Sequence, residues 1–138
     1  MSKMEGSCLC GSMKYSVDAE PVMSAACHCT QCQKQTGTAY SVILGVPADA
    51  VTISGDSLKT FEDTGTSGLP VHRKFCGNCG SPLFTDVKAF EGLLFIKAGT
   101  LDNTDGVSVG AEIWCDSKKN YATLDEQLPK FPGNPPAG

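Results

Sequence analysis

Cysteines are the residues of this chain that are best suited to chemistry. Seven of the eight fall into three short clusters, within residues 8–10, 27–32 and 76–79. Spacings of one or two residues bring thiolates close enough to share one tetrahedral metal ion, with Zn–S bonds of about 2.3 Å. Seven sulfurs divide as four plus three. Four ligands close a structural zinc site, whereas three leave one coordination position open for chemistry.

The first site is expected to join Cys76 and Cys79 to Cys8 and Cys10. A glycine follows each pair and allows the sharp turn that two neighbouring ligands require. A metal that closes so long a loop stabilises the fold strongly, since structural zinc contributes about 10–16 kcal/mol in small peptides. The alternative is a set of four reduced core cysteines, which two short-spaced pairs with flanking glycines do not favour.

The second site is predicted on Cys27, Cys29 and Cys32. One short loop can wrap these sulfurs around one side of an ion, and a helix starting near Thr30 would favour thiolate over thiol. Zinc that already carries three thiolates generates hydroxide poorly. It suits the binding of a substrate thiol and the maintenance of its nucleophilic thiolate. These three cysteines are therefore the predicted catalytic residues, and the predicted chemistry is that of sulfur.

Two histidines, a lone cysteine and two cations remain to be assigned. His28 lies between two predicted ligands and is expected to act outside the ligand shell; the alternatives are a ligand, a proton shuttle or a loop residue that points away. His72 is expected to have a structural or surface role. Cys115 fits a buried, inert thiol; the alternatives are a fourth ligand that closes the second site or a redox partner. Lys34 and Arg73 are the cations nearest the clusters and could bind a substrate carboxylate.

Composition limits the classes of function. The chain has 138 residues, 41% hydrophobic and 19% charged, and a net charge of -4, as in an ordinary globular domain. Basic residues do not cluster enough for nucleic-acid binding, and no apolar run reaches the roughly 18 residues of a membrane span. No signal peptide is visible, so a reducing cytoplasm is expected, where clustered cysteines bind metals more often than they form disulfides. The pattern makes no prediction of oligomeric state.

Short strands between turns predict a mainly β domain over residues 1–131, with an irregular Pro/Gly-rich tail over 132–138. Strands are expected at 13–17, 39–46, 51–53, 58–61, 71–75, 93–97 and 111–115. The third and fourth of these flank a Gly-Asp pair, which predicts a hairpin. Two short helices are expected, one capped by Thr30 and ended by Gly37, the other at 124–128 before Pro129.

Three motifs then resemble the glutathione-dependent formaldehyde-activating enzyme family, which includes centromere protein V relatives. They are Gly6-Ser7-Cys8-Leu9-Cys10-Gly11, Cys27-His28-Cys29-Thr30-Gln31-Cys32-Gln33-Lys34 and Phe75-Cys76-Gly77-Asn78-Cys79-Gly80. Segments 99–102 and 128–131 are also similar, so that the resemblance spans nearly the whole chain.

The resemblance implies a β-tent fold of several coiled β-sheets with few short helices. It implies a structural zinc on Cys8, Cys10, Cys76 and Cys79 and a second, catalytic zinc on Cys27, Cys29 and Cys32. It further implies a carbon–sulfur lyase that joins formaldehyde to the thiol of glutathione, giving S-(hydroxymethyl)glutathione.

Two departures from the family pattern lie where a substrate pocket could form. Glu112 stands where members often carry a histidine, and residues 118–121 replace a Lys-Ala-Pro-Trp type of segment. Two other functions therefore stay open beside the enzyme. One is a non-catalytic zinc module or thiol-binding protein, and the other is a thiol redox sensor, whose cysteines oxidise as metal is released.

Overall fold

The computed structural model describes residues 4–135, and these residues confirm the mainly β prediction. Their strands are β1 Met4–Ser7, β2 Lys14–Val17, β3 Met23–Cys27, β4 Ser41–Pro47, β5 Val51–Ser54, β6 Leu58–Thr64, β7 Pro70–Cys76, β8 Pro82–Val87, β9 Leu93–Lys97 and β10 Glu112–Ile113. One α-helix, α1 Thr30–Thr36, follows β3. Short 3-10 turns η1 to η4 lie at Ala48–Ala50, Lys88–Phe90, Ala98–Thr100 and Cys115–Ser117.

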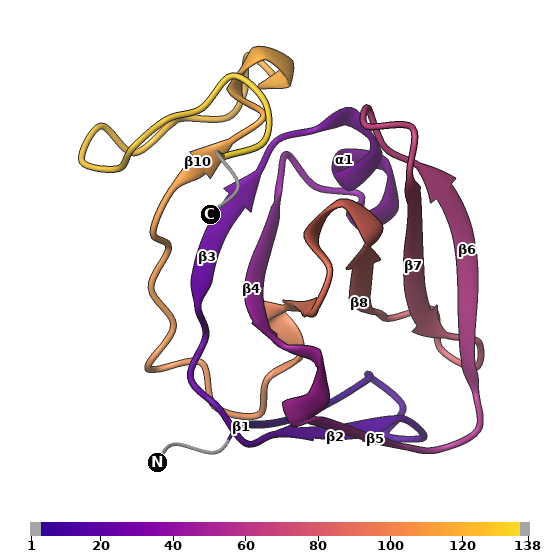
Figure 1. The fold of residues 1–138 in the computed structure, drawn as a ribbon. Helices are drawn as coiled ribbons and strands as arrows, with labels where there is room; N and C mark the ends of the chain where they lie inside the picture. The colour runs from indigo at the N-terminus through magenta and orange to yellow at the C-terminus, as the bar shows by residue number, and fades with distance from the viewer. Residues whose placement is uncertain (1–3, 136–138) are drawn as a thin grey trace.

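The strands form two sheets. The larger has the order β10-β3-β4-β9-β8-β7-β6, and the smaller has the order β1-β2-β5. Within the large sheet, β10 runs parallel to β3, and the other pairs are antiparallel. The large sheet curls, the small sheet lies across one end, and α1 lies at the other end (Figure 1).

The two faces of the large sheet have different tasks, because side chains alternate along a strand. On β9, Leu94 and Ile96 belong to the main core, together with residues of the small sheet such as Val17. The alternate β9 side chains, Phe95 and Lys97, line a cavity on the opposite face. One face of the sheet therefore stabilises the fold, and the other is free to form a site.

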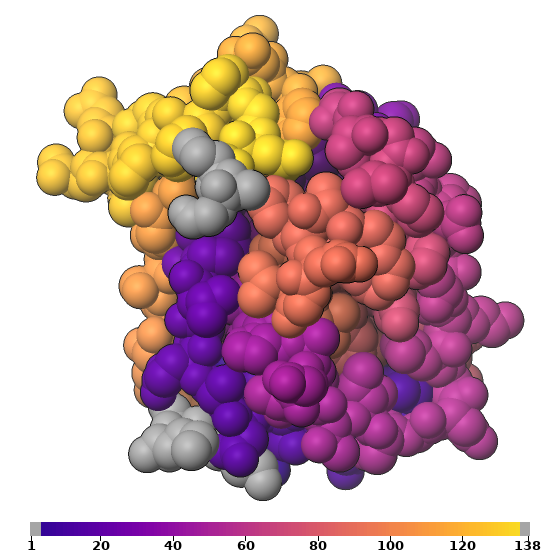
Figure 2. All heavy atoms as spheres, viewed as in Figure 1, coloured from indigo at the N-terminus to yellow at the C-terminus, as the bar shows by residue number. Residues whose placement is uncertain are grey.

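The C-terminal segment extends the sheet edge beyond β10. The N–H of Glu112 donates to the Pro129 carbonyl (2.9 Å), and the N–H of Phe131 donates back to Glu112 (3.0 Å). In the space-filling view this segment, yellow, covers the end of the molecule above the sheet (Figure 2). Among residues 4–135, no helix combines the length and apolar character needed to cross a membrane.

Three expectations about the elements are wrong. Strands β5 and β6 form no hairpin, because β5 pairs with β2 and β6 pairs with β7. No helix forms at 124–128, where the N–H of Asp125 instead donates to the Glu112 carboxylate (2.6 Å). The cap of α1 is Cys29 rather than Thr30, although Gly37 does end the helix, at φ 71°.

Candidate metal centres and the cavity beside them

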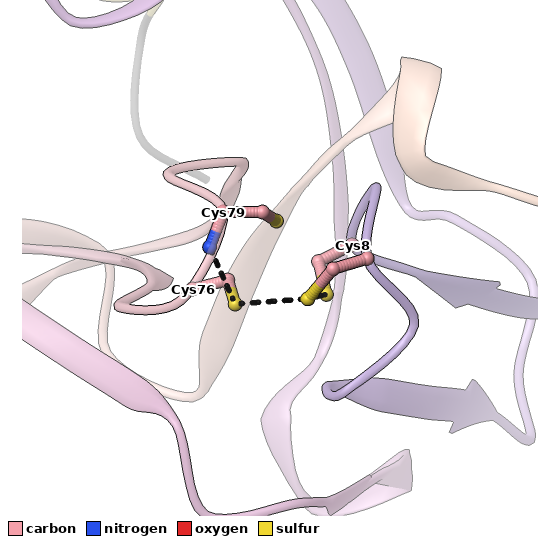
Figure 3. A group of neighbouring side chains, drawn as sticks. Cys8, Cys76 and Cys79 are labelled. Carbon is pink, nitrogen blue, oxygen red and sulfur yellow. Dashed lines mark hydrogen bonds between the residues drawn. The ribbon is translucent and has the colours of Figure 1, made fainter.

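The first cluster joins the loop after β1 to the turn after β7. The Sγ atoms of Cys8, Cys10, Cys76 and Cys79 all lie within 4.8 Å of one another. Tetrahedral zinc places sulfurs on the order of 3.8 Å apart, and the Cys8–Cys10 and Cys10–Cys76 separations are 3.6 and 3.9 Å. Figure 3 shows Cys8 facing Cys76 and Cys79 across this space. The donor set therefore fits one zinc ion with a complete shell of sulfur.

Neutral donors surround these sulfurs. Hydroxyls of Ser12 and Ser57 lie 3.3 Å from the Cys76 sulfur and lower the pKa of that thiol to about 5. Ser12, followed by the Asn78 amide, lowers the pKa of Cys10 to about 7. Burial has the opposite effect on Cys8 and raises its pKa. The surroundings of Cys10 and Cys76 thus favour the thiolate, which is the form that binds metal.

The turn that carries Cys76 follows from its own backbone. The N–H groups of Asn78 and Cys79 point at the Cys76 sulfur, at 3.3 and 3.4 Å. The turn closes when the N–H of Gly80 donates to the Cys76 carbonyl (2.8 Å), with Gly80 at φ 84°. A side chain would resist this angle, so glycine after the second ligand is a requirement of the turn.

The second cluster holds Cys27, Cys29 and Cys32, whose Sγ atoms also lie within 4.8 Å of one another. Cys27 ends β3, Cys32 lies in the first turn of α1, and their sulfurs are 3.4 Å apart. Cys29 caps the helix, because its sulfur accepts a hydrogen bond from the N–H of Cys32 (3.2 Å). All three line the cavity, and their sulfurs fit one side of a zinc ion.

Two buried cations stand beside this cluster. Arg73 Nη1 donates to the Cys32 sulfur at 3.9 Å, and Lys97 is buried with its Nζ 2.8 Å from Ser41 Oγ. The pKa of Cys32 lies far below its ordinary value, first through its contacts with the Cys27 and Cys29 thiols, and then through Lys97 and Arg73. The same sulfur contacts, together with burial, raise the pKa of Cys27. The two basic side chains therefore favour thiolate at Cys32, although burial lowers the pKa of Lys97.

No fourth side chain among residues 4–135 joins the three sulfurs. His28 is fully buried, but its Nε2 pairs with Glu112 Oε1 at 2.7 Å, and it lies outside the group. Cys115, the other alternative ligand, also lies outside it, with its thiol 3.5 Å from the Glu112 carbonyl. Three sulfurs with one open side are therefore what the described residues provide.

Glu112 helps to hold the loop that carries the three cysteines in place. One carboxylate oxygen pairs with His28, and the other accepts the N–H of Asp125 (2.6 Å). The backbone N–H of His28 donates to Ile113 of β10 (3.0 Å). The buried pair thus ties the ligand loop to β10 and the C-terminal segment, and His28 acts outside the ligand shell.

The cavity has a volume of about 640 Å³, within the usual range for small-molecule sites. Its buried or half-buried apolar lining residues are Met23, Ile43, Val71, Val87, Phe90, Leu93, Phe95, Ala111, Ile113 and Trp114. Exposed polar residues lie at its rim, namely Gln31, Thr64, Thr66, Ser67 and Asn134. The walls are thus mainly apolar, apart from the sulfurs, the two cations, the Asp63 carboxylate and the hydroxyls of Ser24 and Thr85.

Trp114 is held in an unusual backbone conformation beside this cavity. Its φ is 58°, and it is the one non-glycine residue with positive φ among residues 4–135. Its indole N–H donates to Asn134 (2.8 Å), and its backbone N–H donates to Gly133 (3.0 Å). Such strain in a bulky residue persists only when its surroundings enforce it, and it gathers at functional sites.

The remaining predicted residues are divided between the cavity and the surface. Arg73 lines the cavity, where its Nε also pairs with Asp63 (3.1 Å). Lys34 is exposed on α1 and lies outside the cavity lining. His72 is half-buried on β7, 3.5 Å from Glu62, away from both clusters.

Sequence reasoning missed Lys97 and Trp114. Lys97 ends an otherwise apolar strand, Leu-Leu-Phe-Ile-Lys. A lysine at the end of an apolar strand could have drawn attention, because lysine is almost never fully buried without a partner. Trp114 is the single tryptophan of the chain, and its strained backbone could not be read from the sequence.

Comparisons with known proteins agree with this geometry. A family model described as glutathione-dependent formaldehyde-activating enzyme matches residues 3–117. Two fungal proteins, provisionally named as enzymes of that description, are each 32% identical. The one from Talaromyces marneffei aligns over 72% of this chain and 54% of its own length. The one from Phaeosphaeria nodorum aligns over 70% and 52%. The chain therefore spans about half the length of these curated relatives.

A solved structure supports the fold. The crystal structure of a Rhodobacter sphaeroides protein superposes with a TM-score of 0.58, covering 76% of this chain and 91% of that protein. Its sequence identity is 16%, so the likeness concerns the arrangement of strands alone.

Proposed function

Because the chain belongs to the glutathione-dependent formaldehyde-activating enzyme family, we propose that it is a carbon–sulfur lyase that joins formaldehyde to the thiol of glutathione. The observation that carries the proposal is the cluster of Cys27, Cys29 and Cys32, open on one side and set in the wall of a cavity. The proposed setting is the reducing cytoplasm, in keeping with eight free cysteines.

In the proposed reaction the glutathione sulfur forms a bond to the formaldehyde carbon. The carbonyl π electrons move to oxygen, which takes up one proton, while the thiol has given up one. The product is S-(hydroxymethyl)glutathione, and no oxidant or reductant is needed. Zinc bound by the three cysteines would lower the pKa of the substrate thiol and favour its nucleophilic form.

The residues of the chain contribute charge, position and exclusion of water. Arg73 and Lys97 attract an anionic sulfur to the cluster, while Arg73, predicted to bind a substrate carboxylate, already pairs with Asp63 and Gln35. Lys34 was predicted for the same task but is exposed outside the cavity lining. The buried hydroxyl of Thr85 has no hydrogen-bond partner among residues 4–135; it lines the cavity and can donate to the developing alkoxide. Apolar walls keep the site dry and so strengthen these interactions.

Exchange spectroscopy by NMR on mixtures of formaldehyde and glutathione tests the proposal. The zinc-loaded protein should accelerate exchange between free glutathione and its adduct. Cys29→Ser should lose at least tenfold of this acceleration and keep its fold, because Cys29 is a half-buried member of the open cluster. Cys115→Ser, outside both clusters, is the matched control. Equal acceleration by Cys29→Ser would contradict the proposal and would favour a non-catalytic zinc module.

A further inference from the structure

We infer that the preferred aldehyde of this site is larger than formaldehyde and carries an apolar group, either aromatic or a branched alkyl chain. This inference rests on the proposed function, since it assigns the substrate class of the same site.

Formaldehyde cannot fill the space beside the open cluster. The cavity measures about 640 Å³, whereas formaldehyde adds only one carbon and one oxygen to the thiol. Sites that bind small molecules tightly bury most of the ligand surface against their walls. An adduct that carries a single hydroxymethyl group would leave most of this apolar wall in contact with water.

The deep wall is built from aromatic and branched side chains. Phe90 and Phe95 pack edge to face, with ring centroids 6.0 Å apart, and both line the cavity. Ile43, Val71 and Ile113 are buried and also line it. These groups gain free energy only from an apolar occupant, at roughly a fourfold gain in affinity per methylene covered.

The polar parts of glutathione fit this wall poorly. Both cations in it already have partners, since Arg73 is bound to Asp63 and Gln35, and Lys97 to Ser41. Burying a further carboxylate or ammonium group without a partner is costly. The exposed rim, by contrast, offers hydroxyl and amide groups at Thr66, Ser67 and Asn134. The peptide part of the thiol therefore belongs at the rim, and the apolar wall is left for the group on the aldehyde.

The chemistry is unchanged by a larger aldehyde. The sulfur bonds to the carbonyl carbon, the π electrons move to oxygen, and the proton released by the thiol is taken up there. The product is a thiohemiacetal whose carbon bears the apolar group. This group would lie against Phe90, Phe95 and their neighbours.

A series of S-alkylglutathiones, from S-methyl to S-hexyl with S-benzyl, tests the inference without catalysis. These stable thioethers mimic the adduct, and binding is followed by the fluorescence of Trp114, the single tryptophan, which lines the cavity. The dissociation constant should fall about fourfold per methylene until the cavity is filled. A flat series would overturn the inference, because it would show that the wall does not receive the chain.

Two phenylalanine variants test which part of the surface contacts the alkyl chain. Phe90→Ala removes an aromatic ring from the cavity wall and should reduce the gain per methylene by half or more. Phe61→Ala removes a ring that is 61% exposed on β6, outside the lining, and should leave the gain unchanged. Equal slopes in both variants would place the alkyl chain elsewhere and contradict the inference.

The exchange rate and the binding series together distinguish the proposed function from the proposed size of the aldehyde. Acceleration of formaldehyde–glutathione exchange with a flat binding series would uphold the function and overturn the inference. A steep binding series without acceleration, for formaldehyde or for phenylacetaldehyde, would overturn both the function and the aldehyde as the occupant. Greater acceleration with phenylacetaldehyde than with formaldehyde supports both.

Discussion

The two cysteine clusters are surrounded by different chemistry. Around the cluster of four, neutral donors such as Ser12, Ser57 and Asn78 contact the sulfurs. Around the cluster of three, the basic side chains of Arg73 and Lys97 lower the pKa of Cys32, while burial lowers the pKa of Lys97 itself. The first cluster joins two loops that hold the fold together, and the second lies in the wall of a cavity.

This contrast supports two different proposed uses of one ligand type. Four thiolates complete the shell of a divalent cation, so that hydrogen bonds from neutral groups are enough to steady them. Three thiolates leave a position open, and fixed cations lower the cost of bringing a further anionic sulfur beside them. The surroundings of the two clusters, rather than the cysteines themselves, thus distinguish the two proposed roles.

The largest expected effect is on folding and belongs to the cluster of four. Cys76→Ser should lose one equivalent of zinc and lower the melting temperature by more than 20 °C, because structural zinc contributes roughly 10 kcal/mol or more to folding. Cys29→Ser should shift it by only a few degrees. Circular dichroism melts and native mass spectrometry measure both. A similar fall in melting temperature in both variants would contradict the proposal that only the cluster of four is structural.

The next effect concerns the rate of metal loss. With a chelator, one zinc equivalent should leave at least tenfold faster than the other, because three ligands and an open side hold an ion less firmly than four. A chromogenic zinc indicator follows the two phases. In Cys29→Ser the fast phase should disappear while the slow phase remains. A single phase with two equivalents in the parent protein would refute this prediction.

A smaller effect is expected from the charge of Lys97. Lys97→Met removes a cation that favours thiolate in the cluster of three, so that the pKa of Cys32 rises and metal is lost at a higher pH. With cobalt in the fast-exchanging site, the midpoint of its charge-transfer band should move up by about one pH unit. Lys34→Met, which alters an exposed lysine on α1, should leave the midpoint in place. A downward shift in Lys97→Met would contradict the role assigned to its charge.

The smallest effect is expected from Ser57→Ala. The hydroxyls of Ser12 and Ser57 lower the pKa of Cys76 to about 5, so this thiolate persists as the pH falls from its usual range toward that value. Removing one hydroxyl should raise the pKa, and zinc should leave the slow site at a pH higher by a few tenths of a unit. Ser54→Ala, which removes a β5 hydroxyl that donates to the Lys14 carbonyl, is the control. Zinc release at an unchanged pH would show that Ser57 does not stabilise the thiolate.

Sequence patterns predicted the local parts of this molecule well. The alternation of apolar and polar residues predicted β2 and β7, and the glycine after α1 predicted where that helix ends. They missed β1, β3 and β8. The first two contain no β-branched or aromatic residue, and β8 begins with a proline. They also joined β5 to β6 across a turn, although the two strands pair with different partners. Pairing depends on where the whole sheet places a strand, and no local signal carries that information.

The sequence by itself determined the number, type and spacing of the thiols, and hence the three local clusters, because ligands one or two residues apart are close in any compact conformation. Only the tertiary structure decided what meets them. Lys97 arrives beside Cys32 through β9, Glu112 reaches His28 through β10, and Trp114 turns to the cavity in a strained conformation. These contacts join residues far apart in the chain, so strand order and register alone bring them together.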